Sequence, residues 1–455
     1  MKSGRCDARG LSTDWVLAEL EGKDAMNKTA VMRCVTGSRH RAVVLSGARL
    51  RSIFLVSIAC VAAGLLAAGA ASSPIGFRAG SRPPISLAVP KRGDWLQYRY
   101  DAAHTSANTS ERRLGVKNVH RLRKAWSVRL GGALAEPAIA GDLLYVSSRG
   151  GVVHVLNSST GQEQWSARID AYRISAPVVS ESAIYVVSDR GVLAALSRAD
   201  GRVLWTRSFT DVEGGSAPPV VAGSVVYVAG TDTAAFDGLT GRELWRRRIG
   251  CFWCSPAIAH DTLYIAGAPD TDDAVDHLYA LSTRTGATRW RARDPRRRVW
   301  GDSPAVAGGR VYMQVARGSG RRALALSAFD TRTGKRQWTA SGGQSEVLPG
   351  DGPAVAHRTV YYASRSGALY ALQAGTGKRL WVRKFTDIVL EPVVANGIVY
   401  SGADGTLFAL SARTGRSLWS TALADGIGTY PVVSAGALYV GSGDGTLHRF
   451  DLGAS

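Results

Sequence analysis

The stretch that decides the fold is Ala280-Leu281-Ser282-Thr283-Arg284-Thr285-Gly286-Ala287-Thr288-Arg289-Trp290, in which an apolar pair leads through a Thr-Gly turn to a tryptophan. Related versions end at seven tryptophans, and an eighth tryptophan precedes the first version. The eight are Trp126, Trp165, Trp205, Trp245, Trp290, Trp338, Trp381 and Trp419. The intervals between neighbours are 39, 40, 40, 45, 48, 43 and 38 residues. A period of about 40 residues predicts a repeat architecture, so we expect these tryptophans to be structural.

Two further intervals stay fixed through the repeats. Each repeat has a proline eight residues before a tyrosine, as Pro219 stands before Tyr227. Each tryptophan that ends a version of the motif follows a leucine or phenylalanine by nine residues, as Trp290 follows Leu281. The stretches between these anchors are short β-branched and aromatic runs such as 225–228, which are typical of strands. Four short strands in about 40 residues predict one blade of a β-propeller.

The repeat count predicts how the ring closes. There are eight proline–tyrosine–leucine/phenylalanine triplets and eight tryptophans, but the two series are out of phase. Trp126 precedes the first triplet, whereas no tryptophan follows the last triplet, which ends at Phe450. We therefore predict an all-β, eight-bladed propeller in which the segment Arg123 to Leu130 supplies the outer strand of the last blade. That closure leaves the ring no open edge.

With these residues set out, the repeat resembles the tryptophan-docking motif A-x-D-x-x-T-G-x-x-x-W of the PQQ-like, quinoprotein-type propeller family. The departures are small: Val155 replaces the first alanine, and the acidic third position is kept only at Asp237 and Asp330. The resemblance covers about residues 94–455, and the lead-in Asp94-Trp95 to His104-Thr105 is similar to the start of such proteins. It implies that each tryptophan packs against the next docking motif. It says little about activity, because one fold hosts many functions.

The chain ahead of the propeller divides into an N-terminal extension, residues 1–71, and a linker, residues 72–93, rich in Pro, Gly and Arg. Residues 53–71 form an uncharged run of apolar and small residues behind Arg49 and Arg51. This layout is typical of a secretory signal peptide, but the run is also long enough to span a bilayer. A cleaved signal and a retained anchor both stay open. In either case we expect an exported, extracytoplasmic chain, secreted or attached to the cell membrane.

The charge of the chain is strongly basic, with 56 Lys and Arg against 36 Asp and Glu, or +20. Without residues 1–71 the balance is 46 basic against 31 acidic residues, or +15. Such a balance favours contact with anionic lipids or wall polymers, although arginines scattered through solvated turns would produce it too. We expect no nucleic-acid partner, because no nucleic-acid motif accompanies the charge.

Two cysteines lie close together within the repeats, at Cys251 and Cys254. In an oxidising compartment such a pair most simply forms a disulfide. A redox-active pair and a zinc site are the alternatives, although two further zinc ligands are not visible. No other metal motif stands out.

The loops of variable length predict which face of the ring binds. The tyrosine-to-leucine and tryptophan-to-proline intervals vary, and because strands alternate direction these loops share one face, the variable-loop face. Residues just before the prolines should surround the mouth of the central channel there. The binding-face candidates are Glu136, Trp253, Trp300, Asp302, Asp351, Glu391 and Tyr430. The carboxylates could bind a cation or a cationic peptide, or they could cap turns and pair with arginines. The tryptophans could stack a ligand or be buried under a loop.

Three functions fit this sequence. The one we favour is a non-catalytic binding or scaffold protein without a cofactor, a monomeric ring with a protein or cell-envelope partner, similar to the propellers of outer-membrane-protein assembly. The second is a quinoprotein dehydrogenase using PQQ and Ca²⁺, with Asp302 or Asp351 as the base. The resemblance speaks against it, because such enzymes carry a disulfide between adjacent cysteines. The third is a membrane-tethered extracytoplasmic sensor.

Overall fold

The computed structural model describes four strands within the first 45 residues, and residues 90–453 except 210–216, 252–253, 270–276, 293–302, 317–322, 345–351 and 365–366. The chain divides into two compact units, Met1–Pro74 and Ile75–Ser455. The first unit contains an antiparallel sheet that the sequence analysis did not predict. Its strands are, in order, β1 (Gly4–Cys6), β2 (Thr13–Leu17), β3 (Ala30–Thr36) and β4 (Arg39–Leu45). The predicted signal or anchor run, 53–71, lies outside the described residues. No helix among the described residues is long and apolar enough to cross a membrane.

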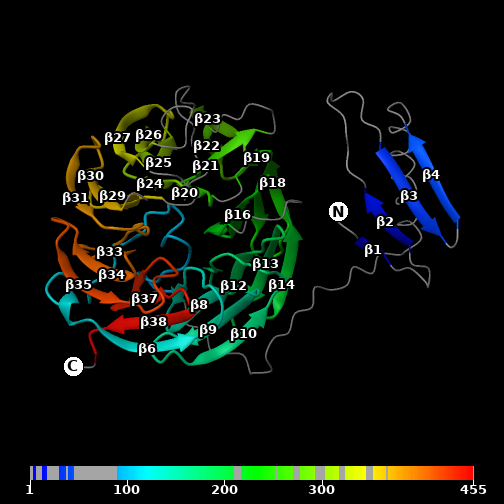
Figure 1. Ribbon diagram of the computed structural model, residues 1–455. Coiled ribbons are helices and arrows are strands. Elements are labelled where there is room, and N and C mark those ends of the chain that lie inside the picture. The colour runs from blue at the N-terminus through cyan, green and yellow to red at the C-terminus, as the bar shows by residue number, and fades with distance from the viewer. Residues whose placement is uncertain are drawn as a thin grey trace. The chain divides into compact units, whose positions relative to one another are not determined.

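The second unit is an eight-bladed β-propeller, as predicted (Figure 1). Each blade is an antiparallel sheet whose first strand lies nearest the axis. The first strands are β7 (Ala138–Ala140), β11 (Val178–Val179), β15 (Val220–Ala222), β20 (Ala257–Ala259), β24 (Ala305–Ala307), β28 (Ala354–Ala356), β32 (Val393–Ala395) and β36 (Val432–Ser434). The second strands are β8 (Leu143–Ser148), β12 (Ala183–Val187), β16 (Val225–Ala229), β21 (Thr262–Pro269), β25 (Arg310–Ala316), β29 (Thr359–Ser364), β33 (Ile398–Ala403) and β37 (Ala437–Gly441).

The third and fourth strands complete the blades toward the rim. The third strands are β9 (Val152–Asn157), β13 (Val192–Ser197), β17 (Thr233–Asp237), β22 (His277–Ser282), β26 (Ala323–Asp330), β30 (Ala368–Gln373), β34 (Thr406–Ser411) and β38 (Thr446–Asp451). The fourth strands are β10 (Glu163–Arg168), β14 (Val203–Ser208), β18 (Glu243–Arg247), β23 (Thr288–Ala292), β27 (Arg336–Gln344), β31 (Arg379–Lys384), β35 (Ser417–Ala422) and β6 (Arg123–Arg129). Two short strands, β5 (Ala107–Asn108) and β19 (Ile249–Gly250), and the 3-10 helix η1 (Val119–Arg121) stand outside this scheme.

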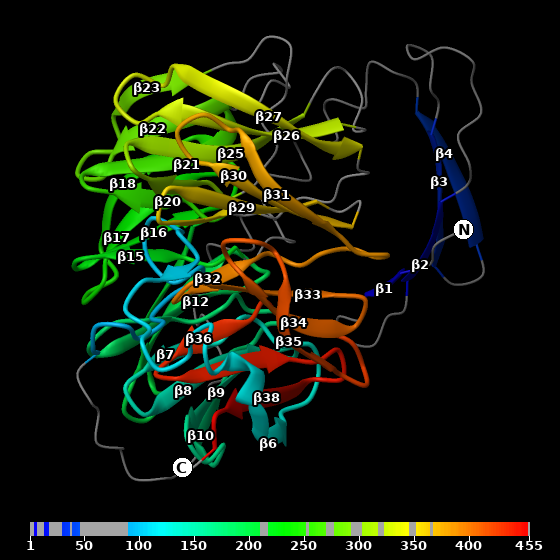
Figure 2. The same cartoon turned by 90° about the vertical axis from the view of Figure 1, so that its left-hand side faces the viewer.

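The ring closes where the start of the propeller meets its end. Strand β6 pairs antiparallel with β38, with Trp126 opposite Arg449, and becomes the outer strand of the eighth blade (Figure 2). The closure predicted from the phase of the repeats is therefore confirmed. Trp419 of the seventh blade donates to the carbonyl of Leu122, 3.2 Å away, so the segment just before β6 also receives the last docking tryptophan.

Burial follows the position of a strand within its blade. The second strands lie between neighbouring blades, and every residue of β8 is buried. The outer strand β31 instead alternates between exposed and half-buried residues. A sheet covered on both faces needs apolar residues on both faces, which explains why the inner runs are rich in Val, Ile, Leu and Ala.

The docking motif works through a hydrogen bond and a close contact. The indole N–H of Trp245 donates to the carbonyl of Thr283 in the next blade, at 2.7 Å. Gly286 of the same motif has a φ of +68°, and a Cβ there would lie 2.6 Å from the Trp245 ring. Only glycine combines that backbone conformation with that closeness, which accounts for the Thr-Gly turn. The docking tryptophans are thus structural, as expected.

Candidate binding site at the mouth of the channel

A segment ahead of the first blade lines the inside of the ring. Residues 95–108, here called the strap, meet the innermost strand of each blade in chain order. In every blade the contact is made at the second residue after the repeat proline. In six blades that residue donates its N–H to a strap carbonyl, over 2.5 to 2.8 Å: Ile139 to Trp95, Val179 to Leu96, Ile258 to Ala102, Val306 to Ala103, Val355 to Thr105, and Val394 to Ser106.

Side chains of the strap serve the remaining two blades. Gln97 binds the backbone of Val221 through both amide atoms, and Asn108 donates to the carbonyl of Val433 at 2.9 Å. An innermost strand has one unpaired edge, and buried N–H groups on such an edge need partners. The strap supplies an acceptor to the N–H of seven blades, and in the eighth blade it instead donates to the carbonyl of Val433.

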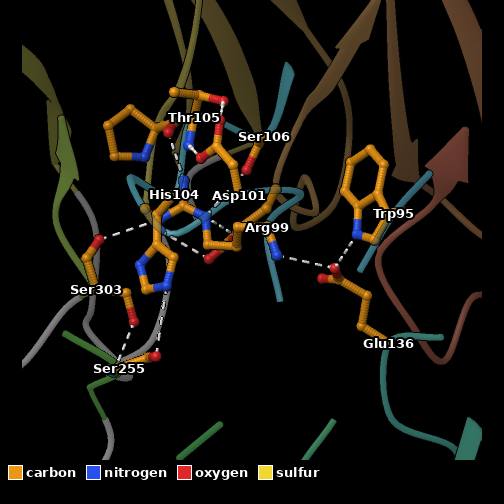
Figure 3. Close-up of polar contacts among 12 residues, drawn as sticks. Trp95, Arg99, Asp101, His104, Thr105, Ser106, Glu136, Ser255 and Ser303 are labelled. Carbon is orange, nitrogen blue, oxygen red and sulfur yellow. Dashed lines mark hydrogen bonds and ion pairs between the residues drawn. The ribbon is translucent and has the colours of Figure 1, made fainter. Parts of the chain in front are cut away.

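Arg99 anchors the strap in the channel. Its side chain is 1% exposed, and its Nε donates to Ser106 Oγ at 3.0 Å (Figure 3). Its Nη1 donates to the carbonyl of Ser303 at 3.1 Å, and its Nη2 donates to that of Pro353. Glu391 Oε2 lies 3.4 Å from Nε and balances the charge. A buried guanidinium is tolerated only with such partners, so Arg99 ties the strap to several blades at once.

Glu136 and Glu391, two of the candidate carboxylates, both contact this arrangement. Glu136 Oε1 accepts hydrogen bonds from Trp95 Nε1 at 2.9 Å and from the backbone N–H of Arg99 at 3.0 Å (Figure 3). Glu391 Oε1 accepts the N–H of Gly352 at 2.7 Å. Burial raises the pKa of Glu136 to about 7, because its charged form has lost water. Both carboxylates therefore hold protein groups in place.

A serine and a histidine in the strap region do not form a nucleophilic pair. His104 Nε2 lies 3.5 Å from Ser255 Oγ, but Ser255 donates its hydroxyl proton to the carbonyl of Pro218 at 2.7 Å. Asp101 accepts from the N–H and the hydroxyl of Thr105 instead of orienting the histidine (Figure 3). Burial holds the pKa of His104 well below its ordinary value, so the ring is neutral. These residues therefore hold the strap in position. They are not arranged as a Ser-His-Asp triad.

A cavity of about 320 Å³, here called the mouth cavity, opens where the strap meets the variable loops. It is lined by Tyr98 of the strap, by Glu136 and Tyr430 just ahead of repeat prolines, and by the apolar side chains of Ile174 and Leu390, among others. Glu136 accepts no hydrogen bond at Oε2 within the described part of the chain, so this oxygen is available to a ligand. The wall of the cavity is thus divided between apolar and polar groups, and Glu136 is the acidic residue among its described lining.

The other candidate residues divide into two groups. Cys251 and Cys254 form a disulfide with a Cα–Cα distance of 5.7 Å, and both are buried ahead of β20. Trp253, Trp300, Asp302 and Asp351 lie outside the described residues. Glu136 and Tyr430 share the mouth cavity, whereas Glu391 is not part of its lining.

The described carboxylates do not fit a Ca²⁺ site for PQQ. Among the described residues, no group of three or more His, Cys, Asp or Glu side chains could hold a metal. The buried guanidinium of Arg99 lies against Glu391, and its charge would repel a cation placed there. No chemical step is therefore assigned to that cofactor.

Comparison with known proteins gives the family. A family model described as the outer membrane protein assembly factor BamB matches residues 116–252 and 233–454. The chain belongs to the BamB family. Within it, BamB of Yersinia pestis is 24% identical over 194 residues, which are 39% of this chain and 48% of that protein. The chain spans about half the length of the curated BamB relatives that it matches.

Two solved structures share the fold. BamB of Moraxella catarrhalis superposes with a TM-score of 0.58 and 22% identity, over 72% of this chain and 99% of that one. The quinohemoprotein alcohol dehydrogenase of Comamonas testosteroni superposes with a TM-score of 0.66 and 16% identity, over 80% and 82%. At these identities the likeness shows the propeller alone, which scaffolds and enzymes have in common.

The strap was the part of the site that sequence reasoning missed. Its lead-in was recognised by resemblance, but Tyr98, Arg99 and Asn108 were not singled out. One signal could have indicated their role. The eight innermost strands each have an edge that needs a partner, and the residues ahead of Arg123 are the segment next to the blades that could provide it.

Proposed function

We propose that this protein is an exported, non-catalytic scaffold that holds a protein partner of the cell envelope on its variable-loop face. Membership of the BamB family supports this role, because its relatives are named as outer membrane protein assembly factors. The partner would insert one apolar or aromatic side chain into the mouth cavity, while surrounding loops contact the rest of its surface. No cofactor takes part.

The mouth cavity carries the proposal. Its volume of about 320 Å³ suits one large side chain, and Ile174, Leu390 and the ring of Tyr430 provide an apolar wall. Central, desolvated pockets that take one anchor residue dominate the energy of many protein interfaces. The strap forms part of the cavity wall through Tyr98, so the anchor side chain would stop at the mouth of the channel.

Two features support an extracytoplasmic location. The Cys251–Cys254 disulfide is of a kind that persists in oxidising compartments. The apolar run at 53–71, behind two arginines, has the layout of an export signal. If this run is retained as an anchor, the same binding face would serve a membrane-tethered sensor. The mass of the mature protein, which shows where its N-terminus lies, distinguishes the cleaved form from the anchored form.

Photo-crosslinking tests the binding face. A crosslinking amino acid replaces Tyr430 at the mouth cavity and, as a matched control, Leu239, which is 79% exposed on a docking turn of the opposite face. We expect a discrete adduct in cells from position 430 and none from position 239. Leu390→Arg, which puts a charge into the cavity, should remove the adduct. The same adducts from both positions, or their survival in the Leu390→Arg variant, would refute the proposed face.

A quinoprotein dehydrogenase is the second candidate, because the fold is shared with a quinohemoprotein alcohol dehydrogenase. It would use PQQ with Ca²⁺ and take Asp302 or Asp351 as its base. PQQ is titrated into the full chain with and without Ca²⁺, followed by tryptophan fluorescence and by thermal shift, with a dye-linked alcohol and sugar assay on the same sample. Saturable Ca²⁺-dependent binding with turnover would replace the scaffold proposal. No binding at PQQ concentrations well above micromolar would refute the dehydrogenase and support the scaffold proposal.

A further inference from the structure

The face opposite the variable loops has a cleft between the fifth and sixth blades, here called the arginine cleft. It has a volume of about 680 Å³ and is lined by Arg310, Tyr312, His357, Arg358, Gln373 and Gly375, with short apolar stretches of the same turns. Its walls are the turns that join first to second strands in the two blades, the turn between β30 and β31, and the start of β25. Among the described residues, no acidic side chain lines it.

In the part of the chain that the structure describes, the two arginines of the arginine cleft have no carboxylate partner. Arg310 donates from Nη1 to the carbonyl of Gly308 at 3.1 Å, and its buried Nε has no hydrogen-bond partner. Within the described residues, neither Arg310 nor Arg358 forms an ion pair, and His357 is exposed beside them. Elsewhere in the ring, Arg246 and Arg289 pair with carboxylates. Two guanidinium groups in one cleft, without a carboxylate partner among the described residues, form a site for anions.

The turn that carries His357 and Arg358 is strained. His357 and Arg358 have φ values of +45° and +67°, a left-handed conformation that glycine and asparagine adopt most easily. The equivalent turns of neighbouring blades use Gly308-Gly309 and Asn396-Gly397. Strain kept where a better turn residue is available indicates a role for the side chain.

A second cleft extends the charged surface. It measures about 370 Å³, shares Ala307 and Gly308 with the arginine cleft, and adds Arg289 and Arg332. Asp261, the carboxylate among its described lining residues, is held by Arg289, which keeps the pKa of Asp261 below its ordinary range. Arg332 forms no ion pair within the described residues. Together the two clefts are too large for a single small anion.

We propose that the arginine cleft binds an acidic oligosaccharide, a chain of sugar or polyol units that carries repeated carboxylate or phosphate groups. Guanidinium groups bind both anions through paired hydrogen bonds. The amide of Gln373, whose Oε1 accepts from Thr376 at 2.7 Å, can still donate to a hydroxyl group. An acidic peptide fits less well, because the walls are turns and present no free strand edge for an extended chain to join. This proposal is independent of the mouth cavity.

The test uses the full chain and three defined probes at physiological salt: tetragalacturonate for carboxylates, a glycerol phosphate tetramer for phosphates, and maltotetraose as the neutral counterpart. Calorimetry should detect binding of at least one acidic probe and none of maltotetraose. The acidic probe that binds identifies the anion. No binding of either acidic probe at millimolar concentration would overturn the proposal, as would equal binding of maltotetraose.

Two variants separate the cleft from the net charge of the protein. Arg310→Gln with Arg358→Gln should weaken binding at least tenfold, whereas Arg168→Gln with Arg379→Gln, two exposed arginines on outer strands, should change it less than twofold. Equal losses in both pairs would mean binding by overall charge and would refute the site. Gly375→Tyr provides a test without a charge change: it has open space around its Cβ position and should block the cleft, again about tenfold. Unchanged binding in that variant would also refute the site.

Discussion

Glu136 should make the ring less stable as the pH rises, whereas most carboxylates make a protein more stable as the pH rises. Its pKa rises from 4.5 to about 7 on folding, chiefly because burial removes water from its charged form. Between these two values the folded state holds a proton that the unfolded state has lost. The free energy of unfolding therefore falls as the pH rises through this window, and it is recovered below about pH 4.5.

The size of the effect follows from the shift. Each pKa unit corresponds to about 1.4 kcal/mol, so a rise from 4.5 to about 7 amounts to about 3 kcal/mol lost at pH 8. Glu136→Gln carries no charge at any pH, and its side-chain oxygen can still accept from Trp95 and Arg99. We expect this variant to match the wild type at pH 4 and to be more stable by up to about 3 kcal/mol at pH 8.

Urea unfolding followed by tryptophan fluorescence at pH 4, 5, 6, 7 and 8 measures this difference. Glu181→Gln is the matched control, because Glu181 is exposed in a turn of the second blade. The control should follow the wild type at every pH. If Glu136→Gln is no more stable than the wild type at pH 8, or if its pH dependence equals that of Glu181→Gln, the burial argument for Glu136 is wrong.

Three further predictions concern the ring itself. A chain that starts at Gly131 lacks β6 and should melt well below the full chain by calorimetry; an unchanged melting temperature would contradict closure by that strand. Gly201→Ala would place a Cβ 2.6 Å from Trp165 at a positive φ, so it should lose about 2–4 kcal/mol in urea unfolding, whereas Gly223→Ala, strained but with open space, should lose about 1 kcal/mol. Equal losses would show that docking contact is unimportant. Arg358→Gly should raise stability by roughly 0.5–1 kcal/mol by relieving left-handed strain, and a decrease would refute the strain.

The blades could be predicted from the sequence because their determinants repeat. A glycine stands four residues before the tryptophan in every docking motif, as Gly286 stands before Trp290, so one pattern seen seven times indicated the fold and the missing outer strand. The strap could not be predicted in this way, because it occurs once and most of its bonds join backbone atoms. Glu136 was identified as a mouth residue from its place before a proline. Its partner Arg99 could not be identified in this way, because Arg99 does not belong to the repeat and lies far in sequence from its other partners, Glu391 and Ser303.

The arginine cleft escaped prediction for a related reason. Arg358 lies in the turn before β29, whereas Arg310 is the first residue of β25, just after the equivalent turn of the fifth blade. In the sequence each is one of many arginines. Their meeting across one cleft depends on how neighbouring blades pack. The strain at His357 and Arg358 is likewise a property of φ, and residue type alone does not report it.

Closure by β6 has a consequence for the time course of biosynthesis. The strand that completes the eighth blade is made before any other blade strand, yet its partner, β38, is made last. The two are separated by more than 300 residues, and pairing at such separation is slow because the intervening loop must first lose its entropy. The growing chain therefore cannot close its ring until β38 has been made. Until β38 arrives, β6 has no partner strand, and an unpaired strand edge of this kind is prone to aggregation.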